Sequence, residues 1–70
     1  MDVKNIISFL RQKRIKMEIT QDQMSKYLKC NRKSYWNLEK GLKKLTLKDF
    51  ILVCEKLEIK PSEALKEMNL

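Results

Sequence analysis

The apolar residues of this chain recur at helical intervals that are interrupted by short polar breaks. The first series falls at the i, i+3, i+4, i+7 spacing of one helix face, and it comprises Val3, Ile6, Ile7 and Leu10. With Asp2 near its start, this spacing predicts a first helix from about residue 2 to residue 17. Its last turns carry the positive charges that suit the C-terminal end of a helix, namely Arg11, Lys13, Arg14 and Lys16.

A second helix is predicted from about residue 21 to residue 28, with Met24 and Leu28 facing inward. Thr20 precedes this helix as a candidate N-cap, and Gln23 stands at the position that completes a capping box. The helical pattern then breaks for about three residues, so a second helix and a third are expected to be joined by a tight turn.

Asn31 is a candidate N-cap for a third helix, predicted from about residue 32 to residue 40. The helix ends before Gly41, the only glycine of the chain, where a left-handed C-cap fits. Tyr35 and Leu38 are three positions apart and are expected to face the core. The opposite face is basic, aromatic and amide-bearing, and it consists of Arg32, Lys33, Trp36, Asn37 and Lys40. Because a plain solvated helix rarely exposes a tryptophan, this face is a candidate binding surface.

Thr46 is expected to cap a fourth helix, from about residue 47 to residue 57. This segment is the most apolar of the chain, through Leu47, Phe50, Ile51, Val53, Cys54 and Leu57. Pro61 opens a fifth helix that runs to about residue 68. The last apolar residues either bury against the first helix or form a dimer interface, and the pattern leaves both uses open for Leu65, Met68 and Leu70.

These elements predict an all-α fold of five short helices around one core, with residues 1–70 as a single domain. One glycine and one proline leave little turn chemistry for a sheet, while a hydrophobic fraction of 43% is enough for a packed core. The sequence holds no apolar run long enough for a signal peptide or a membrane span. We therefore expect a cytoplasmic location.

Charge is distributed unevenly along the chain. The formal net charge is +7, but residues 1–48 hold thirteen basic residues against four acidic ones, a balance of +9. Residues 49–70 hold three basic residues against five acidic ones, a balance of −2. Such segregation indicates one half that faces a polyanion and another that faces water or a partner.

The residue types argue against catalysis and against a metal or other cofactor. The chain has no histidine and no C-x-x-C spacing, and Cys54 within an apolar stripe is expected to be a small buried hydrophobe. No serine or cysteine has a recognisable nucleophile setting, and no glycine-rich phosphate loop is present. A basic first helix also suits a membrane surface, but the core needs its few apolar residues, so no membrane contact is expected.

Residues 19–28 read ITQDQMSKYL, and residues 31–41 read NRKSYWNLEKG. With Leu10 and Arg14 in register upstream and Thr46-Leu47 downstream, these stretches resemble the phage repressor and Cro type of helix-turn-helix protein, also called XRE-like. The resemblance covers about residues 6–66. It implies that the predicted second and third helices form the helix-turn-helix and that the third enters the DNA major groove.

The resemblance assigns roles to single residues. The base-reading positions are Arg32, Lys33 and Asn37, whose side chains suit guanine and adenine edges. Contacts to the DNA backbone are expected from Gln21, Asn31, Ser34, Trp36, Lys40, Lys43 and Lys44. The family also pairs Arg14 with Glu39, an ion pair that ties the first helix to the third.

Three positions depart from the family pattern. Lys29 in the turn and Glu58 after the fourth helix replace glycines, so each is expected to adopt a left-handed conformation at a cost of about 1 kcal/mol. Trp36 replaces a small or polar residue, and it suits either a thymine methyl or sugar edge of DNA or a protein contact.

The sequence thus predicts a transcriptional regulator of the repressor kind that binds double-stranded DNA. Because one such domain reads few base pairs, a homodimer on a pseudo-palindromic operator is expected. Two alternatives remain: an antitoxin-like or accessory module that mainly binds a partner protein, and an interaction module that has lost DNA contact. The basic and amide-bearing third helix argues against the second alternative.

Overall fold

The computed structural model describes residues 3–66, with side chains from Asn5 onward, and contains five helices and no strand within this range. The helices are α1 (Val3–Lys16), α2 (Gln21–Tyr27), α3 (Arg32–Glu39), α4 (Leu47–Lys56) and α5 (Pro61–Lys66). The predicted all-α class and the number of helices are confirmed, and the bounds of α1 to α4 agree within one residue. Asp2, Met68 and Leu70 lie outside the described residues. None of the described helices is long and apolar enough to cross a bilayer.

Side-chain caps begin three of the helices. Thr20 accepts from the backbone N–H of Gln23 at 3.0 Å, and the Gln23 side chain accepts from the Thr20 N–H at 2.9 Å, so the predicted capping box is confirmed. Asn31 accepts from the Ser34 N–H at 2.7 Å at the start of α3. Thr46 accepts from the Asp49 N–H at 3.1 Å at the start of α4. These caps satisfy backbone donors that a helix start leaves free, and they define where α2, α3 and α4 begin.

Each of the first four helices is followed, two residues after its last residue, by a residue with positive φ. The angle is 75° at Gly41, 58° at Lys29, 57° at Glu58 and 58° at Glu18. At the end of α2 the Lys29 N–H donates to Lys26 at 3.1 Å and the next N–H donates to Ser25 at 3.0 Å, the bond pair of a Schellman C-cap. The left-handed conformations expected at Lys29 and Glu58 are confirmed. Glu18 is a further case that its sequence context did not indicate.

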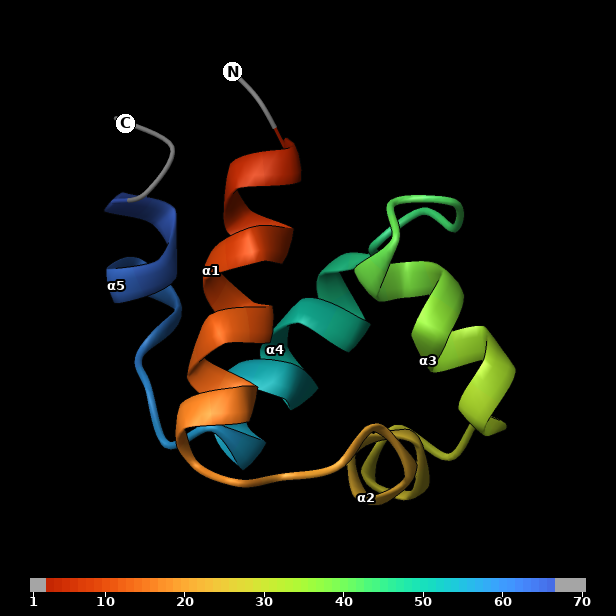
Figure 1. Cartoon of the computed structure of the whole chain (residues 1–70). Coiled ribbons are helices and arrows are strands. Elements are labelled where there is room, and N and C mark those ends of the chain that lie inside the picture. The colour runs from red at the N-terminus through yellow and green to blue at the C-terminus, as the bar shows by residue number, and fades with distance from the viewer. Residues whose placement is uncertain (1–2, 67–70) are drawn as a thin grey trace.

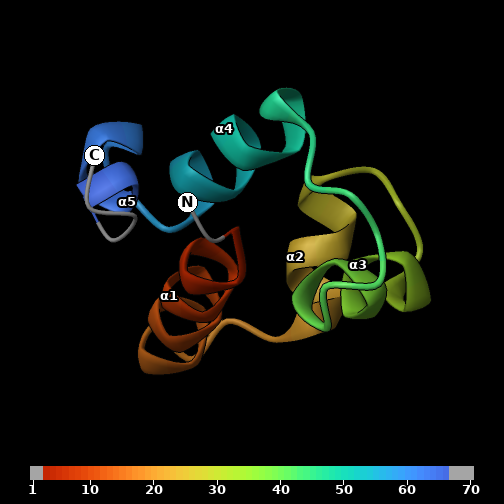
Figure 2. The ribbon, with the colours of Figure 1, turned by 90° about the horizontal axis from the view of Figure 1, so that it is seen from above.

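The helices surround a core to which each contributes. Figure 1 shows α1 standing beside α5, with α4 behind it and α3 at the far edge, and Figure 2 shows the same arrangement from above. The buried hydrophobic side chains are Ile6, Leu10, Met24, Leu28, Tyr35, Leu38, Phe50, Val53, Cys54, Leu57 and Ala64. The inward positions predicted for Met24, Leu28, Tyr35 and Leu38 are therefore confirmed, as is the buried Cys54.

Not every apolar residue of α4 is buried. Leu47 is 74% exposed and Ile51 is 43% exposed, although the same helix contributes three side chains to the core. On α5, Leu65 is 39% exposed, so the described residues cover it only in part. Burial against α1 and use in a dimer interface both stay predictions for Leu65.

Candidate nucleic-acid interface

The inner side of α3 is fixed by a buried ion pair. The Arg14 guanidinium of α1 donates through Nε to Glu39 Oε2 at 2.6 Å and through Nη2 to Oε1 at 3.2 Å. Both side chains are less than a tenth exposed, so the two-pronged pair lies out of water. The expected tie between the first and third helices is confirmed.

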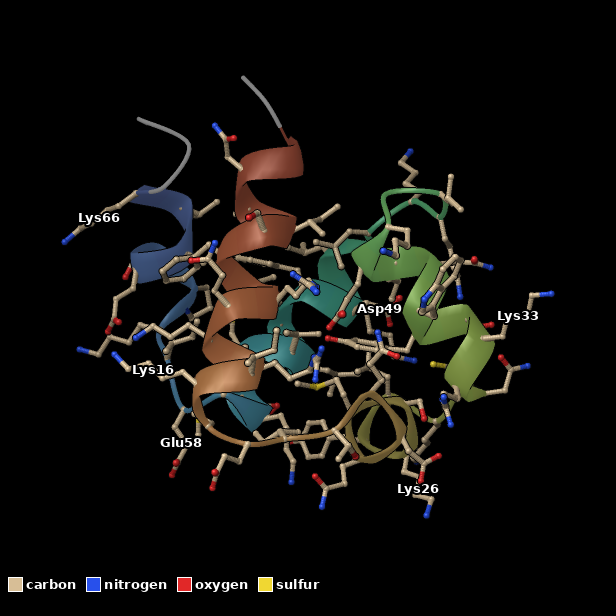
Figure 3. The ribbon with its side chains drawn as sticks, viewed as in Figure 1. Lys16, Lys26, Lys33, Asp49, Glu58 and Lys66 are labelled. Carbon is tan, nitrogen blue, oxygen red and sulfur yellow. The ribbon has the colours of Figure 1, made fainter. Side chains whose placement is uncertain are left out.

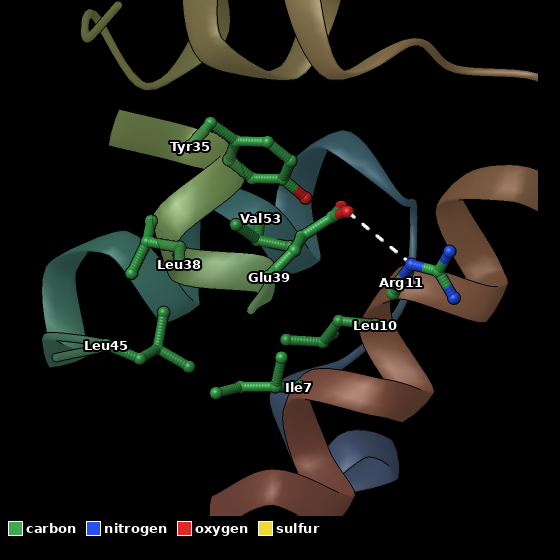
Figure 4. A pocket seen from close by; sticks show the side chains of 8 residues that line it. All are labelled: Ile7, Leu10, Arg11, Tyr35, Leu38, Glu39, Leu45 and Val53. Atoms are coloured by element: carbon green, nitrogen blue, oxygen red, sulfur yellow. Dashed lines mark ion pairs between the residues drawn. The ribbon is translucent and has the colours of Figure 1, made fainter. Parts of the chain in front are cut away.

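Further donors converge on the same carboxylate. Gln21 Nε2 at the start of α2 donates to Glu39 Oε1 at 3.1 Å, and Arg14 Nη1 also donates to the carbonyl of Ile19 at 2.7 Å. The second arginine of α1, Arg11, lies 3.8 Å from Glu39 Oε1 and is half exposed (Figure 4). Glu39 therefore joins α1, α2 and α3 at one point and sets the position of α3 against the other two helices.

Burial and hydrogen bonding act in opposite directions on Glu39. Burial raises the pKa of Glu39, but the hydrogen bonds from Arg14, Tyr35 and Gln21 outweigh it and hold that pKa below its usual value. The Tyr35 hydroxyl points toward the carboxylate (Figure 4). Burial, reinforced by this carboxylate, raises the pKa of Tyr35. At neutral pH the junction thus holds a charged Glu39 and a neutral Tyr35 beside the Arg14 guanidinium.

A small cavity lies beside this junction. It has a volume of about 20 Å³ and is walled mainly by apolar side chains of α1, α3 and α4, including Leu10, Leu38 and Val53 (Figure 4). A space of this size is comparable to one water molecule. It is a packing gap in the core and not a site for a small ligand.

The opposite side of α3 is exposed and basic. We call Arg32, Lys33, Trp36 and Lys40 the outer face of α3. Arg32 and Lys33 form no ion pair within residues 5–66, and Lys33 extends outward from the edge of the molecule (Figure 3). Trp36 is 40% exposed and lines a shallow hollow together with these two residues. The Nζ of Lys40 lies 5.5 Å from the centre of the Trp36 ring, a distance suited to a cation–π contact.

A second hollow adjoins the outer face of α3 where α2 begins. It is lined by Arg14, Thr20, Gln21, Asp22 and Arg32. Arg32 contributes to both hollows, so the surface is continuous from the start of α2 to the middle of α3. Three of these five side chains bear charge.

The remaining predicted site residues are placed differently. Asn31 uses its side-chain oxygen as the cap of α3, while Ser34 and Asn37 are half-buried. Lys43 and Lys44 are exposed in the loop between α3 and α4. The structure therefore gathers Arg32, Lys33, Trp36 and Lys40 on one face, and it places the two loop lysines beyond the C-terminal end of that helix.

Among the contacts of this region that sequence reasoning missed, two differ in whether the sequence gives a signal. The first is the ion pair of Arg11 with Glu39, for which the sequence gives no signal because the two residues are far apart in the chain. The second is the stacking of Lys40 on Trp36, which the i, i+4 spacing of the two residues does indicate.

A metal site needs grouped ligands and a reactive thiol needs a thiolate, and the described residues bear on both. Within the residues that the structure describes, no three or more Cys, Asp or Glu side chains are grouped so that they could hold a metal ion. Cys30 and Cys54 are both free thiols, and burial raises the pKa of Cys54, which disfavours its reactive thiolate. The outer face of α3 is instead built from cationic and aromatic groups that suit a polyanion.

Comparison with known protein families gives one clear result. A sequence model of the helix-turn-helix family matches residues 10–63, which include α2, α3 and α4. The chain belongs to this family, in its XRE-like form of phage repressor and Cro type. It is therefore a DNA-binding domain of the transcription-regulator class, a class that typically has no enzymatic activity. Comparison with curated proteins and with solved structures gives no significant match.

Proposed function

We propose that this chain is a repressor that binds a specific double-stranded DNA operator as a homodimer in the cytoplasm. The observation that carries this proposal is the exposed cationic face of α3, on which Arg32 and Lys33 have no ion pair among residues 5–66, held in place by the buried Arg14–Glu39 pair on its other side. A helix presented in this way fits the major groove, where side chains reach base edges. Residues 1–70 then act as one DNA-binding domain, without a cofactor.

Three residues of α3 are proposed to read bases. Arg32 and Lys33 are exposed at the first turn of α3, where both side chains can donate to guanine O6 and N7. Asn37 is half-buried one turn further on and offers an amide that matches an adenine edge. Each good contact of this kind discriminates against a wrong base by about 1–3 kcal/mol.

Other residues are proposed to hold the DNA backbone. Trp36 extends apolar surface beside the base-reading residues, where a thymine methyl or a sugar is within its reach. The exposed cations of the C-terminal end and the following loop neutralise phosphates, and the start of α2 adds polar groups at the other end. These backbone contacts are assigned to Gln21, Asn31, Ser34, Trp36, Lys40, Lys43 and Lys44.

A dimer follows from the short reach of one domain. Three base-reading side chains specify few base pairs, whereas a useful operator must be distinguished from a large excess of other sequences. Two copies on half-sites about 34–36 Å apart, one helical turn of DNA, double the number of bases read.

The test is selection from a random-sequence duplex library, with the recovered sequences read and affinity measured against salt. We expect a two-fold related motif. We also expect affinity to fall by about 10³–10⁵-fold between 50 and 200 mM salt for 6–10 phosphate contacts. Recovery of no motif, with weak binding even at low salt, would overturn the proposal and favour a module whose partner is a protein.

Two variants separate base contacts from phosphate contacts in that experiment. Arg32→Ala should relax selection at one base position of each half-site. Lys43→Ala should weaken binding to all sequences alike and reduce the salt slope by about one per bound copy. Lys66→Ala is the matched control, because it removes an exposed lysine of α5 that lies away from α3 (Figure 3).

A further inference from the structure

The exposed side of α4 combines apolar and charged residues. We call Leu47, Lys48, Ile51 and Glu55 the outer face of α4, and all four are exposed. Lys48 and Glu55 form no ion pair within residues 5–66. The other side of α4 is packed into the core, so this helix is fixed while its outer face is uncovered.

The order of charges on this face is self-complementary. Lys48 and Glu55 are seven residues apart, about 10.5 Å along the helix axis, and Ile51 lies near the midpoint. If a second α4 runs antiparallel across the first, a two-fold axis near Ile51 brings each Lys48 opposite the partner's Glu55. The same axis brings the two Ile51 side chains together at the centre of the contact, while Leu47 lies at its rim. An interface between identical chains requires this reciprocal pairing of unlike residues.

We propose that the outer face of α4 is the surface through which two copies of this chain dimerise. The proposal deepens the proposed function and rests on it for its biological role, because an operator-binding dimer needs an interface that leaves α3 free. Figure 2 shows α4 lying apart from α3, with the loop over residues 40–46 between them. One central apolar side chain per copy with flanking charges makes a small contact, so a weak dimer is expected.

The test is analytical ultracentrifugation of the full chain without DNA, at 50 mM salt and up to about 1 mM protein. The wild-type chain should dimerise. Lys48→Glu and Glu55→Lys should each weaken the dimer by about ten-fold or more, because each turns two attractive pairs into two repulsive ones. The double variant Lys48→Glu/Glu55→Lys exchanges both charges, so it should regain the wild-type Kd.

The control for Lys48→Glu is Lys16→Glu, which makes the same change in net charge at the exposed end of α1 (Figure 3) and should leave the Kd unchanged. Circular dichroism of each variant checks that the fold is retained. A chain that stays monomeric throughout, single variants that behave like Lys16→Glu, or a double variant without recovery would each overturn this interface.

The same variants distinguish failure of this interface from failure of the proposed function. A chain that dimerises as described but selects no DNA motif retains the α4 interface and loses the operator role. A chain that selects a two-fold related motif, but whose dimerisation is insensitive to the charge exchange, retains the operator role and uses another surface.

Discussion

The two sides of α3 differ in nearly every physical respect. On the inner side Tyr35 is 3% exposed, and the Glu39 side chain is 5% exposed and bound by donors from α1 and α2. On the outer face Trp36 is 40% exposed, and Arg32 and Lys33 have no ionic partner among residues 5–66. One helix of eight residues thus has a hydrogen-bonded, buried carboxylate on one side and, among the described residues, cations without an ion pair on the other.

This contrast separates the residues that fix the position of α3 from the residues that are available to bind DNA. A buried, paired side chain changes the free energy of unfolding when it is removed, whereas an exposed unpaired cation does so only slightly. An exposed unpaired cation is also ready to bind phosphate or a base without first breaking an internal contact. Substitutions on the inner side should therefore change stability, and substitutions on the outer face should change DNA affinity.

The largest effect is expected at the buried junction. Arg14→Ala leaves the Glu39 carboxylate buried without its main partner and should lower the free energy of unfolding by about 3 kcal/mol. A chain of this size has only about 3.5–10 kcal/mol of stability, so the loss is severe. Urea unfolding followed by circular dichroism at pH 7 measures it.

Arg11→Ala is the matched control for this prediction. It removes the other arginine that approaches Glu39, but that side chain is 51% exposed at 3.8 Å and should be worth less than about 1 kcal/mol. Should Arg14→Ala not fold, Arg14→Lys keeps the charge and loses the two-pronged geometry, so it should be intermediate. Equal losses for Arg11→Ala and Arg14→Ala would show that burial of the pair does not matter.

The same junction should make stability depend on pH. Because the pKa of Glu39 is lowered on folding, its contribution is present above the unfolded value of about 4.3 and is lost as the pH falls through the folded value. The raised pKa of Tyr35 acts at the other end, so its contribution is lost as the pH rises above about 10. Urea unfolding at pH 3, 7 and 10.5 tests both directions. In Glu39→Gln the decrease between pH 7 and pH 3 should be smaller than in the wild type.

The sequence predicted much of this fold because its signals are local. The spacing of apolar residues and the caps at Thr20, Asn31 and Thr46 depend on residues within one or two turns, and they located α1 to α4 to within about a residue. The outward side of α3 follows from the same helical periodicity. The helix-turn-helix and the Arg14–Glu39 pair came from the resemblance, since no local rule connects residues 25 positions apart.

What the sequence could not predict depends on tertiary packing. The Gln21 amide was assigned only to DNA, yet in the structure it donates to Glu39, because folding brings the start of α2 to the end of α3. The exposure of Leu47 and Ile51 was likewise not predictable, because both belong to the most apolar segment of the chain. The apolar composition of a helix does not indicate which of its sides is covered by neighbouring helices. The DNA contacts of single residues remain predictions.

Two adjacent residues of α3 offer a sharper test of the contrast. Tyr35→Phe removes only the hydroxyl that points toward Glu39, and it should cost about 1 kcal/mol of stability without changing DNA affinity. Trp36→Ala removes exposed surface, and it should weaken DNA binding about ten-fold while changing stability by less than about 0.5 kcal/mol. Thermal unfolding and titration with the selected duplex measure both quantities in each variant. If Trp36→Ala destabilises the fold and leaves DNA affinity unchanged, Trp36 acts in stability, like the residues on the inner side of α3.

The smallest expected effect concerns the turn that leads into α3. Lys29 has a φ of 58° and is exposed, so Lys29→Gly relieves left-handed strain and should raise the free energy of unfolding by about 0.5–1 kcal/mol. For a domain of this size, 1 kcal/mol corresponds to a rise in Tm of about 4–8 °C. Glu58→Gly relieves the same strain, with a φ of 57°, at the end of α4 and without removing a basic residue, so it should give a similar gain. If Lys29 makes no contact with DNA, Lys29→Gly and Glu58→Gly should bind DNA equally well. Weaker DNA binding by Lys29→Gly alone would instead extend the DNA-binding surface from the outer face of α3 into the turn.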